Sequence, residues 1–272
     1  MRRHLRALAL IAVTACALVT VEAASPASAA TTPGTMAGQS WLVKDNDWHT
    51  IGGAGTFQWS AWGTATGGTY GTTWAGQDAY PAEPGNTRTF ASWTVLRRDA
   101  AQILPGQWVL WDTEWWKFTP AFQRADPQRY TRLAIALVHA HGGHIITTSC
   151  CGINAKIAQA ADAAAHGADV VAVQTQVDDR DPAAFTALVK RAVAAVRAVS
   201  PATPILAGLS SDAGGIPATA ADMTAEWKAT HGLVQGFWLN AARWKPPAGQ
   251  GCAPRGCPAT VRAFLKAIGA VP

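Results

Sequence analysis

The sequence predicts an α/β protein, a single-domain (β/α)8 barrel of the TIM type, from three observations. Beyond residue 108 the chain alternates five times between a short apolar strand and a helix. The strand centres are almost continuously apolar, which is typical of a parallel sheet covered on both faces. The length of 272 residues, of which 49% are hydrophobic, suits one barrel of this kind. A doubly wound sheet is the alternative, but no G-x-G-x-x-G turn follows any strand.

Hydrophobic periodicity places five strand–helix pairs in the second part of the chain. The strands are predicted at 108–114, 144–150, 169–176, 204–210 and 234–240. The helices are predicted at 127–141, 154–166, 181–199, 219–230 and 258–268. Asp181-Pro182 is typical of an N-cap followed by proline in the first turn. Three glycines are expected to end helices with a positive φ: Gly142, Gly167 and Gly232.

The part of the chain before residue 108 must supply the remaining strands. Residues 41–43 and 56–59 are predicted as strands, 89–93 as a third, and 94–103 as a helix. These bring the total to seven or eight, which favours the eight-stranded barrel over the doubly wound sheet. The Gly- and Thr-rich stretch 52–85 is expected to be a long loop that packs its aromatic residues on the barrel, or a flap over the mouth.

The first 29 residues have the features of a secretory signal peptide. A positive n-region (Arg2, Arg3, Arg6) precedes the apolar run 7–21, and Ala27-x-Ala29 offers a cleavage site. We therefore expect the mature domain to be 30–272, secreted and extracellular. The alternative is a lipid anchor on Cys16, because residues 13–16 resemble a lipobox. No second apolar segment is long enough to span a membrane.

Four cysteines remain beyond the predicted cleavage site, an even number that fits an oxidising compartment. Cys252 and Cys257 can close a short loop through Pro254 and Gly256, so we predict a disulfide between them. Cys150 and Cys151 form either a vicinal bridge or two free thiols. A zinc site fits less well, because two of its ligands would be adjacent in sequence.

Net charge gives no support for a nucleic-acid partner. The formal charge is +5, and three arginines and one glutamate of the total lie in the first 29 residues. The remaining surplus is small and includes no Lys/Arg cluster. His139, His141 and His144 surround a predicted helix end on the face away from the mouth, so we expect surface or capping roles for them and no metal site.

Polar and aromatic residues follow the apolar strand centres at the carboxyl ends, where a parallel barrel builds its site. Residues two apart there face the same way, so these side chains should converge on one pocket. The predicted site residues are Asp112, Glu114, Trp115, Trp116, Gln174, Gln176, Asp178, Ser210, Trp238 and Asn240.

Asp112 and Glu114 are the predicted catalytic pair. Their Cα atoms lie about 6.5–7 Å apart on one strand face, so burial should raise the pKa of one carboxyl. A protonated Glu114 could donate to a leaving-group oxygen while ionised Asp112 stabilises positive charge. Tryptophans beside them would supply an apolar wall. The structural alternative is that both carboxylates cap the next segment or pair with an arginine.

The strand ending in Asp112-x-Glu114, followed four strands later by Gly236-Phe-Trp-Leu-Asn240, is similar to the chitinase-type glycoside hydrolases of family 18. The resemblance implies that Glu114 is the acid and Asp112 its partner in substrate-assisted hydrolysis. The segment Trp111-Asp-Thr-Glu-Trp-Trp with Thr119-Pro120 also resembles a group of secreted actinobacterial barrel proteins without an attached activity.

The sequence thus predicts a secreted, monomeric enzyme that hydrolyses glycosidic bonds of a polysaccharide or cell-wall glycan, without metal or cofactor. Amides would hydrogen-bond sugar hydroxyls, and Trp115, Trp116 and Trp238 would stack on sugar rings. Two alternatives remain open. One is a non-catalytic barrel that binds glycan or cell wall. The other is a divalent-metal-dependent hydrolase or lyase at Asp112, Glu114 and Asp178.

Overall fold

The computed structural model describes residues 40–44, 59–61, 87–113, 119–175, 181–211, 217–240 and 258–270. These residues contain one eight-stranded sheet with the strand order β2-β1-β8-β7-β6-β5-β4-β3. Every strand pair in it is parallel. This is the cyclic order of a (β/α)8 barrel, so the predicted fold class is confirmed.

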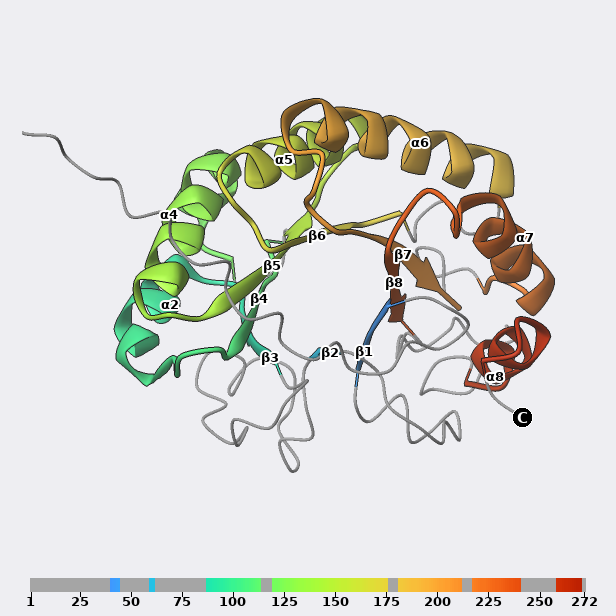
Figure 1. Cartoon of the computed structure of the whole chain (residues 1–272), viewed down its shortest axis with the longest axis horizontal. Coiled ribbons are helices and arrows are strands. Elements are labelled where there is room, and N and C mark those ends of the chain that lie inside the picture. The colour runs from blue at the N-terminus through green and yellow to red at the C-terminus, as the bar shows by residue number, and fades with distance from the viewer. Residues whose placement is uncertain are drawn as a thin grey trace, which may run out of the picture. The chain divides into compact units, whose positions relative to one another are not determined.

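The strands curve around a common centre (Figure 1). Their bounds are β1 Ser40–Lys44, β2 Trp59–Ala61, β3 Thr87–Phe90, β4 Trp108–Trp111, β5 His144–Ser149, β6 Val170–Val173, β7 Ile205–Ser210 and β8 Gly236–Asn240. β4 and β6 each end three residues earlier than the sequence predicts, and β2 and β3 are shifted by a few residues. Each consecutive pair from β3 to β8 is hydrogen-bonded, and β8 also pairs with β1.

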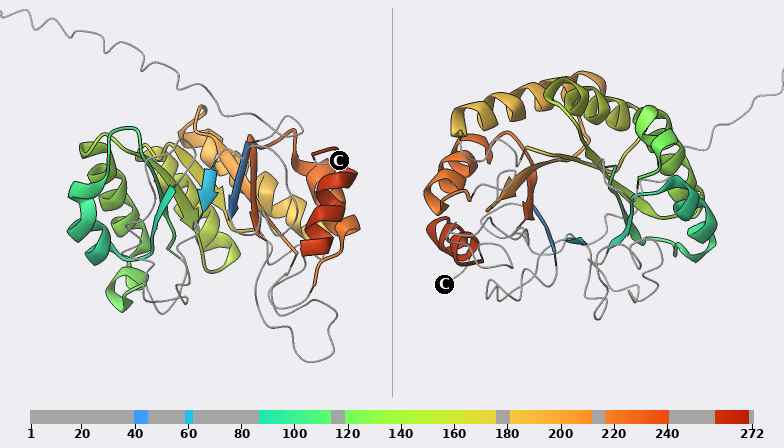
Figure 2. Two further views of the ribbon diagram at one scale, coloured as in Figure 1. Left: turned by 90° about the horizontal axis from the view of Figure 1, so that it is seen from below. Right: turned by 180° about the vertical axis from the view of Figure 1, so that it is seen from behind.

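Helices cover the outer face of the curved sheet (Figure 2). Their bounds are α2 Trp93–Asp99, α3 Ala121–Ala125, α4 Pro127–Ala140, α5 Ile153–Ala165, α6 Pro182–Val199, α7 Ala220–Thr230 and α8 Pro258–Ala267, with a 3-10 turn at Ala100–Gln102. Short helix α3 is not predicted from the sequence. Among the described residues, no helix combines the length and the apolar character needed to cross a membrane.

Helix ends follow the predicted chemistry with one exception. Asp181 caps α6 by accepting hydrogen bonds from the N–H groups of Ala183 and Ala184. Gly142 and Gly167 have positive φ angles of 74° and 88°, as predicted after α4 and α5. Gly232 does not adopt a positive φ, which corrects the prediction. Helix α7 passes into His231 with helical backbone angles, so its end needs no left-handed residue.

Alternate residues of the strands pack into two separate hydrophobic clusters. Residues facing the helices form the larger core, which includes Trp111, Ile145, Val171 and Phe237. Residues facing inward form a second cluster made of Leu110, Ile146, Val170, Ala172, Leu206 and Trp238. This division follows from the two-residue period of a strand. The barrel interior is therefore filled by side chains.

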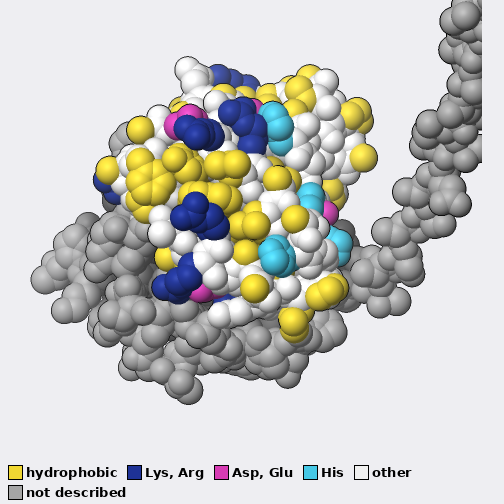
Figure 3. Space-filling view, turned by 90° about the vertical axis from the view of Figure 1, so that its left-hand side faces the viewer, with side chains coloured by type: hydrophobic (Ala, Val, Ile, Leu, Met, Phe, Trp, Pro, Cys, Tyr) yellow, Lys and Arg dark blue, Asp and Glu magenta, His cyan; other side chains and the backbone are white. Residues whose placement is uncertain are grey.

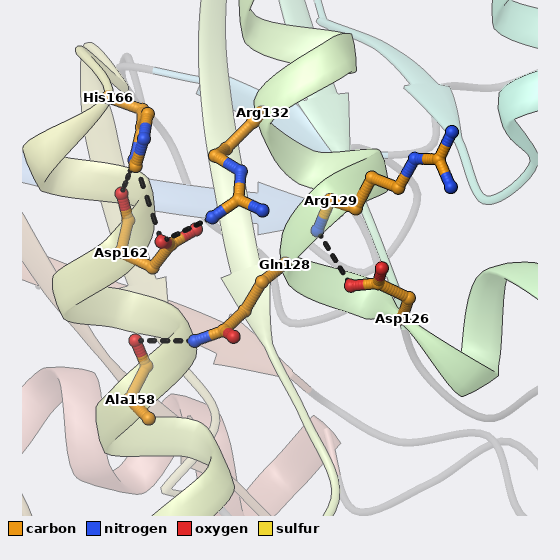
Figure 4. Close-up of polar contacts among 7 residues, drawn as sticks. All are labelled: Asp126, Gln128, Arg129, Arg132, Ala158, Asp162 and His166. Atoms are coloured by element: carbon orange, nitrogen blue, oxygen red, sulfur yellow. Dashed lines mark hydrogen bonds and ion pairs between the residues drawn. The ribbon is translucent and has the colours of Figure 1, made fainter.

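Neighbouring helices α4 and α5 are joined by polar contacts (Figure 4). Arg132 forms an ion pair with Asp162 at 3.0 Å, and Gln128 donates to the carbonyl of Ala158. Asp126 caps α4 by accepting from the Arg129 N–H. These contacts fix the spacing of α4 and α5 outside β4 and β5.

The space-filling view of the side where α2 and α4 lie shows apolar side chains bordered by Lys and Arg, with histidines gathered along one edge (Figure 3).

Asp99, at the end of α2, makes stability depend on pH. Arg98 donates to both carboxylate oxygens, at 2.6 and 2.8 Å. These hydrogen bonds, with the charges of Arg98 and Arg88, hold the pKa of Asp99 below its ordinary value, although burial opposes the shift. A lowered pKa in the folded state contributes stability above the unfolded-state pKa, and this contribution is lost as pH falls through the folded-state value.

We expect Asp99→Asn to lower the urea midpoint of unfolding at pH 7, because the carboxylate–guanidinium bonds are lost. The difference from the wild type should shrink as pH falls below about 4. There the carboxyl of the unfolded state binds a proton before the carboxyl of the folded state does, so the stabilisation by ionised Asp99 is lost. Urea titrations at pH 7, 5 and 3 measure this. An equal difference at all three pH values would contradict the assignment.

Candidate functional site

Four buried polar side chains lie on the inner face where β4, β5, β6 and β7 reach their carboxyl ends. Each follows an inward-facing apolar residue of its own strand at an even spacing, which places it on the same face. The four are Asp112, Thr148, Gln174 and Ser210, with 1%, 3%, 7% and 0% of their surface exposed. The structure therefore brings the predicted residues Asp112, Gln174 and Ser210 to one end of the barrel.

Asp112 is tied directly to the neighbouring strand by Thr148. The Thr148 hydroxyl lies 3.2 Å from the Asp112 Oδ1 atom and 3.3 Å from the Trp111 carbonyl oxygen, and its single proton can be donated to either. The same hydroxyl accepts the Thr113 N–H at 3.3 Å, and Thr113 Oγ1 donates to the Thr148 carbonyl at 3.2 Å. These bonds cross between the ends of β4 and β5, so Thr148 connects the Asp112 carboxylate to the neighbouring strand.

Helix α5 supplies two further side chains to this end of the sheet. Lys156 is buried, with 4% of its surface exposed, and its Nζ donates to the Gln174 carbonyl. Gln159 accepts the Cys150 N–H and donates to the Cys150 carbonyl, both at 3.1 Å. The ends of β5 and β6 are thus held by one helix.

Lys156 is not among the residues predicted from the sequence, although the sequence contains a signal for it. Lys156 shares the buried face of α5 with Ala160, Ala163 and Ala164. A lysine at helical spacing from three buried alanines, near the start of a helix that follows a barrel strand, indicates a cation placed beside the strand ends.

Cys150 and Cys151 form a vicinal disulfide immediately after β5. This decides between the two possibilities that the sequence leaves open for them. Cys252 and Cys257, predicted to form the other bridge, lie outside the described residues, so that pairing stays a prediction.

Of the other predicted site residues, some lie outside the described residues and two lie in β8. Glu114, Trp115, Trp116, Gln176 and Asp178 lie outside the described residues, as does the stretch 52–85. Asn240 ends β8, and the sheet register places it opposite Ser210.

Trp238 lies in the barrel interior with only 3% of its surface exposed. It packs with Leu110, Ile146 and Leu206 in the inner cluster. The predicted stacking of its ring on a sugar stays a prediction.

The histidines lie at the opposite end of the strands, where the sequence predicts them. His139 Nε2 and His144 Nδ1 contact the two Asp169 carboxylate oxygens at 2.8 and 3.3 Å. Asp169 also accepts the Ile145 N–H. Within the described ranges, no three His, Cys, Asp or Glu side chains form a group that could hold a metal ion.

Comparisons with known proteins find solved structures of low similarity. No family model matches the chain, and neither does any curated protein. A solved structure of HMG-CoA lyase from Brucella melitensis matches at 14% identity and a TM-score of 0.43, covering 68% of this chain and 66% of the lyase. A putative deoxyribose-phosphate aldolase from Coccidioides immitis matches at 9% identity and 0.40, covering 71% of each chain. The carboxyl transferase domain of Rhizobium etli pyruvate carboxylase matches at 13% and 0.45, covering 85% of this chain and 48% of the other.

The comparisons contradict the predicted glycosidase. The similar structures named above are a lyase, an aldolase and a carboxyl transferase domain, and none is a glycoside hydrolase. The resemblance to family 18 fails because it was based on strand order and two short motifs. Any (β/α)8 barrel places polar residues at its strand ends, so these features follow from the fold and not from one chemistry.

We expect Thr148→Val to lower the free energy of unfolding by about 1–3 kcal/mol, because the shape is kept while the Thr113 N–H and the Asp112 carboxylate lose a buried partner. Urea unfolding of both proteins measures the difference. Ser200→Ala is the matched control, since its hydroxyl bonds Thr203 on the outside of the barrel. A Thr148→Val protein as stable as the wild type would show that this hydroxyl does not hold the strand ends.

Proposed function

We propose that the chain is a divalent-metal-dependent enzyme of the lyase or hydrolase type, with its reaction at the carboxyl end of β4–β8. One observation supports this most: a buried carboxylate, Asp112, lies on the inner face at the end of β4 with its direction fixed by Thr148. In (β/α)8 barrels, catalytic groups come from this end of the strands.

The chemistry of the donors fits a hard divalent cation. Asp112 offers a carboxylate and Ser210 a hydroxyl. Oxygen donors of these kinds suit Mg²⁺, Mn²⁺ or Ca²⁺ and do not suit copper or iron–sulfur chemistry. Glu114 and Asp178, which follow β4 and β6 in the sequence, are the proposed additional ligands.

Each described residue has a distinct part in this proposal. Asp112 holds the cation, and Thr148 keeps the carboxylate oriented. Gln174 binds substrate oxygens. Leu110, Ile146 and Trp238 close the barrel beneath the site and exclude water from it. A divalent cation bound there would act as a Lewis acid on a substrate carbonyl or phosphoryl oxygen.

Titration of the chelator-treated full chain with Mn²⁺ or Mg²⁺, followed by calorimetry and thermal unfolding, tests the metal site. At a concentration about 100 times Kd, the ion should stabilise the native state by about 2.7 kcal/mol and raise Tm by several degrees. Asp112→Asn should abolish both effects, because the amide carries no charge. Asp169→Asn, at the other end of the strands, should keep them.

Saturable binding that survives unchanged in Asp112→Asn would overturn the proposed site, as would no binding to the wild type. Activity is assayed on substrates in which a carbon–carbon or ester bond lies beside a carbonyl, since that oxygen is the group a Lewis acid polarises. Turnover should stop with chelator and return with Mn²⁺. Metal binding without turnover on any substrate would indicate a non-catalytic binding barrel.

Export of the mature domain 30–272 is a separate proposal that rests on the leader sequence. Expression of the full chain with its leader, followed by N-terminal sequencing of the protein from the culture medium, should return Ala30 as the first residue. Protein that stays with the membrane and carries a lipid on Cys16 would support the lipobox instead, and uncleaved protein inside the cell would contradict both.

A further inference from the structure

The vicinal disulfide lies next to the proposed site. Cys150 directly follows β5 and is buried, and Thr148, which orients Asp112, is two residues before it. Ser149, the residue before Cys150, pairs with Val173, the residue before Gln174, in the sheet register. The disulfide therefore lies close to Thr148, the hydrogen-bond partner of Asp112, and close to the end of β6.

The backbone at this bridge adopts an unusual conformation. Cys151 has a φ of 76°, and it is the sole non-glycine residue with positive φ in the described part of the chain. Gly152 follows with a φ of 98° and begins α5. A side chain with a Cβ disfavours the left-handed region, so such a residue persists only where its surroundings hold it there. The covalent ring closed by adjacent cysteines supplies that constraint.

Two side chains of α5 connect this turn to the site. Gln159 clamps both backbone polar groups of Cys150, and Lys156 bonds the carbonyl of Gln174. These hydrogen bonds connect the turn to the start of α5 and to the Gln174 carbonyl, and Thr148 lies two residues before Cys150 in the chain.

We propose that the Cys150–Cys151 disulfide is a redox switch that keeps the site competent when oxidised and weakens it when reduced. Cys151 is half-buried, so its sulfur is the one a reductant reaches first, while Cys150 is buried. A dithiol reductant attacks Cys151 Sγ, the Sγ–Sγ bond breaks and Cys150 leaves as a thiolate that takes a proton. The second thiol of the reductant then displaces Cys151, so two electrons and two protons pass to the protein and the reductant becomes a disulfide.

Reduction frees Cys151 to leave the left-handed region, and the turn that aligns Thr148, Gln159 and Lys156 relaxes. Because partners that orient a ligand typically change metal affinity by about 10- to 100-fold, Mn²⁺ affinity should fall by about tenfold or more on reduction. The effect on affinity rests on the proposed function. The effect on the backbone does not.

Hydrogen exchange of the full chain, with and without dithiothreitol, tests the switch directly. Amides of 147–159 should exchange faster after reduction, while those of α7 stay unchanged, and reoxidation should restore slow exchange. Alkylation and mass spectrometry count the thiols at Cys150 and Cys151. The Cys252→Ser/Cys257→Ser variant, which lacks the other predicted bridge, should keep the response.

The Cys150→Ser/Cys151→Ser variant should behave as the reduced protein in either condition. If this variant does not fold, reversible reduction of the wild type still decides the matter. Unchanged exchange in 147–159 after complete reduction of both cysteines would overturn the switch. Changed exchange without metal binding in either state would uphold the switch and refute the proposed function, and equal Mn²⁺ affinity in both states would overturn the link between them.

Discussion

The two-residue alternation of parallel strands is the constraint on which the site depends. The apolar side chains of Leu110, Ile146, Ala172 and Leu206 pack together in the barrel interior. Because side chains alternate along a strand, residues at even spacing beyond these four lie on the same inner face. The apolar interior thus determines that Asp112 and its neighbours reach the carboxyl end of the barrel, and the packing of hydrocarbon side chains sets the position of a carboxylate.

A buried carboxylate is stable only when donors or positive charge surround it. Part of this support comes from Thr148, which bridges β4 and β5. A second layer comes from α5, whose Lys156 and Gln159 hold the ends of β6 and β5. The proposed site is therefore supported by β5, the strand next to Asp112, and by the first turns of α5, the helix that follows β5. This concentration of contacts is the basis for the proposed influence of the covalent bridge at the β5–α5 turn.

The second part of the barrel could be predicted from sequence because each element there carries a clear period. The caps at Asp181, Gly142 and Gly167 follow from local chemistry in the same way. The strand ends are less predictable, because polar residues such as Glu114 and Gln176 continue the alternation after the sheet pairing stops. The short strands β2 and β3 occur in Gly- and Thr-rich surroundings, where no period distinguishes them from loop.

The site could be predicted only in part. Asp112, Gln174 and Ser210 follow from strand alternation, and the structure places them on one face. Trp238 also lies on the inner face, where it packs with Leu110, Ile146 and Leu206. Lys156 acts from a helix, so a search of strand ends does not find it. The chemistry itself does not follow from the fold, because one barrel supports many reactions.

A crystal of residues 30–272 soaked in Mn²⁺, with the anomalous signal of manganese recorded, tests the proposed metal site most directly. We expect a peak within coordination distance of the Asp112 carboxylate, with Thr148 still bonded to that side chain. An anomalous peak confined to the Asp169 histidines at the opposite end, or no peak at an ion concentration well above the measured Kd, would contradict it.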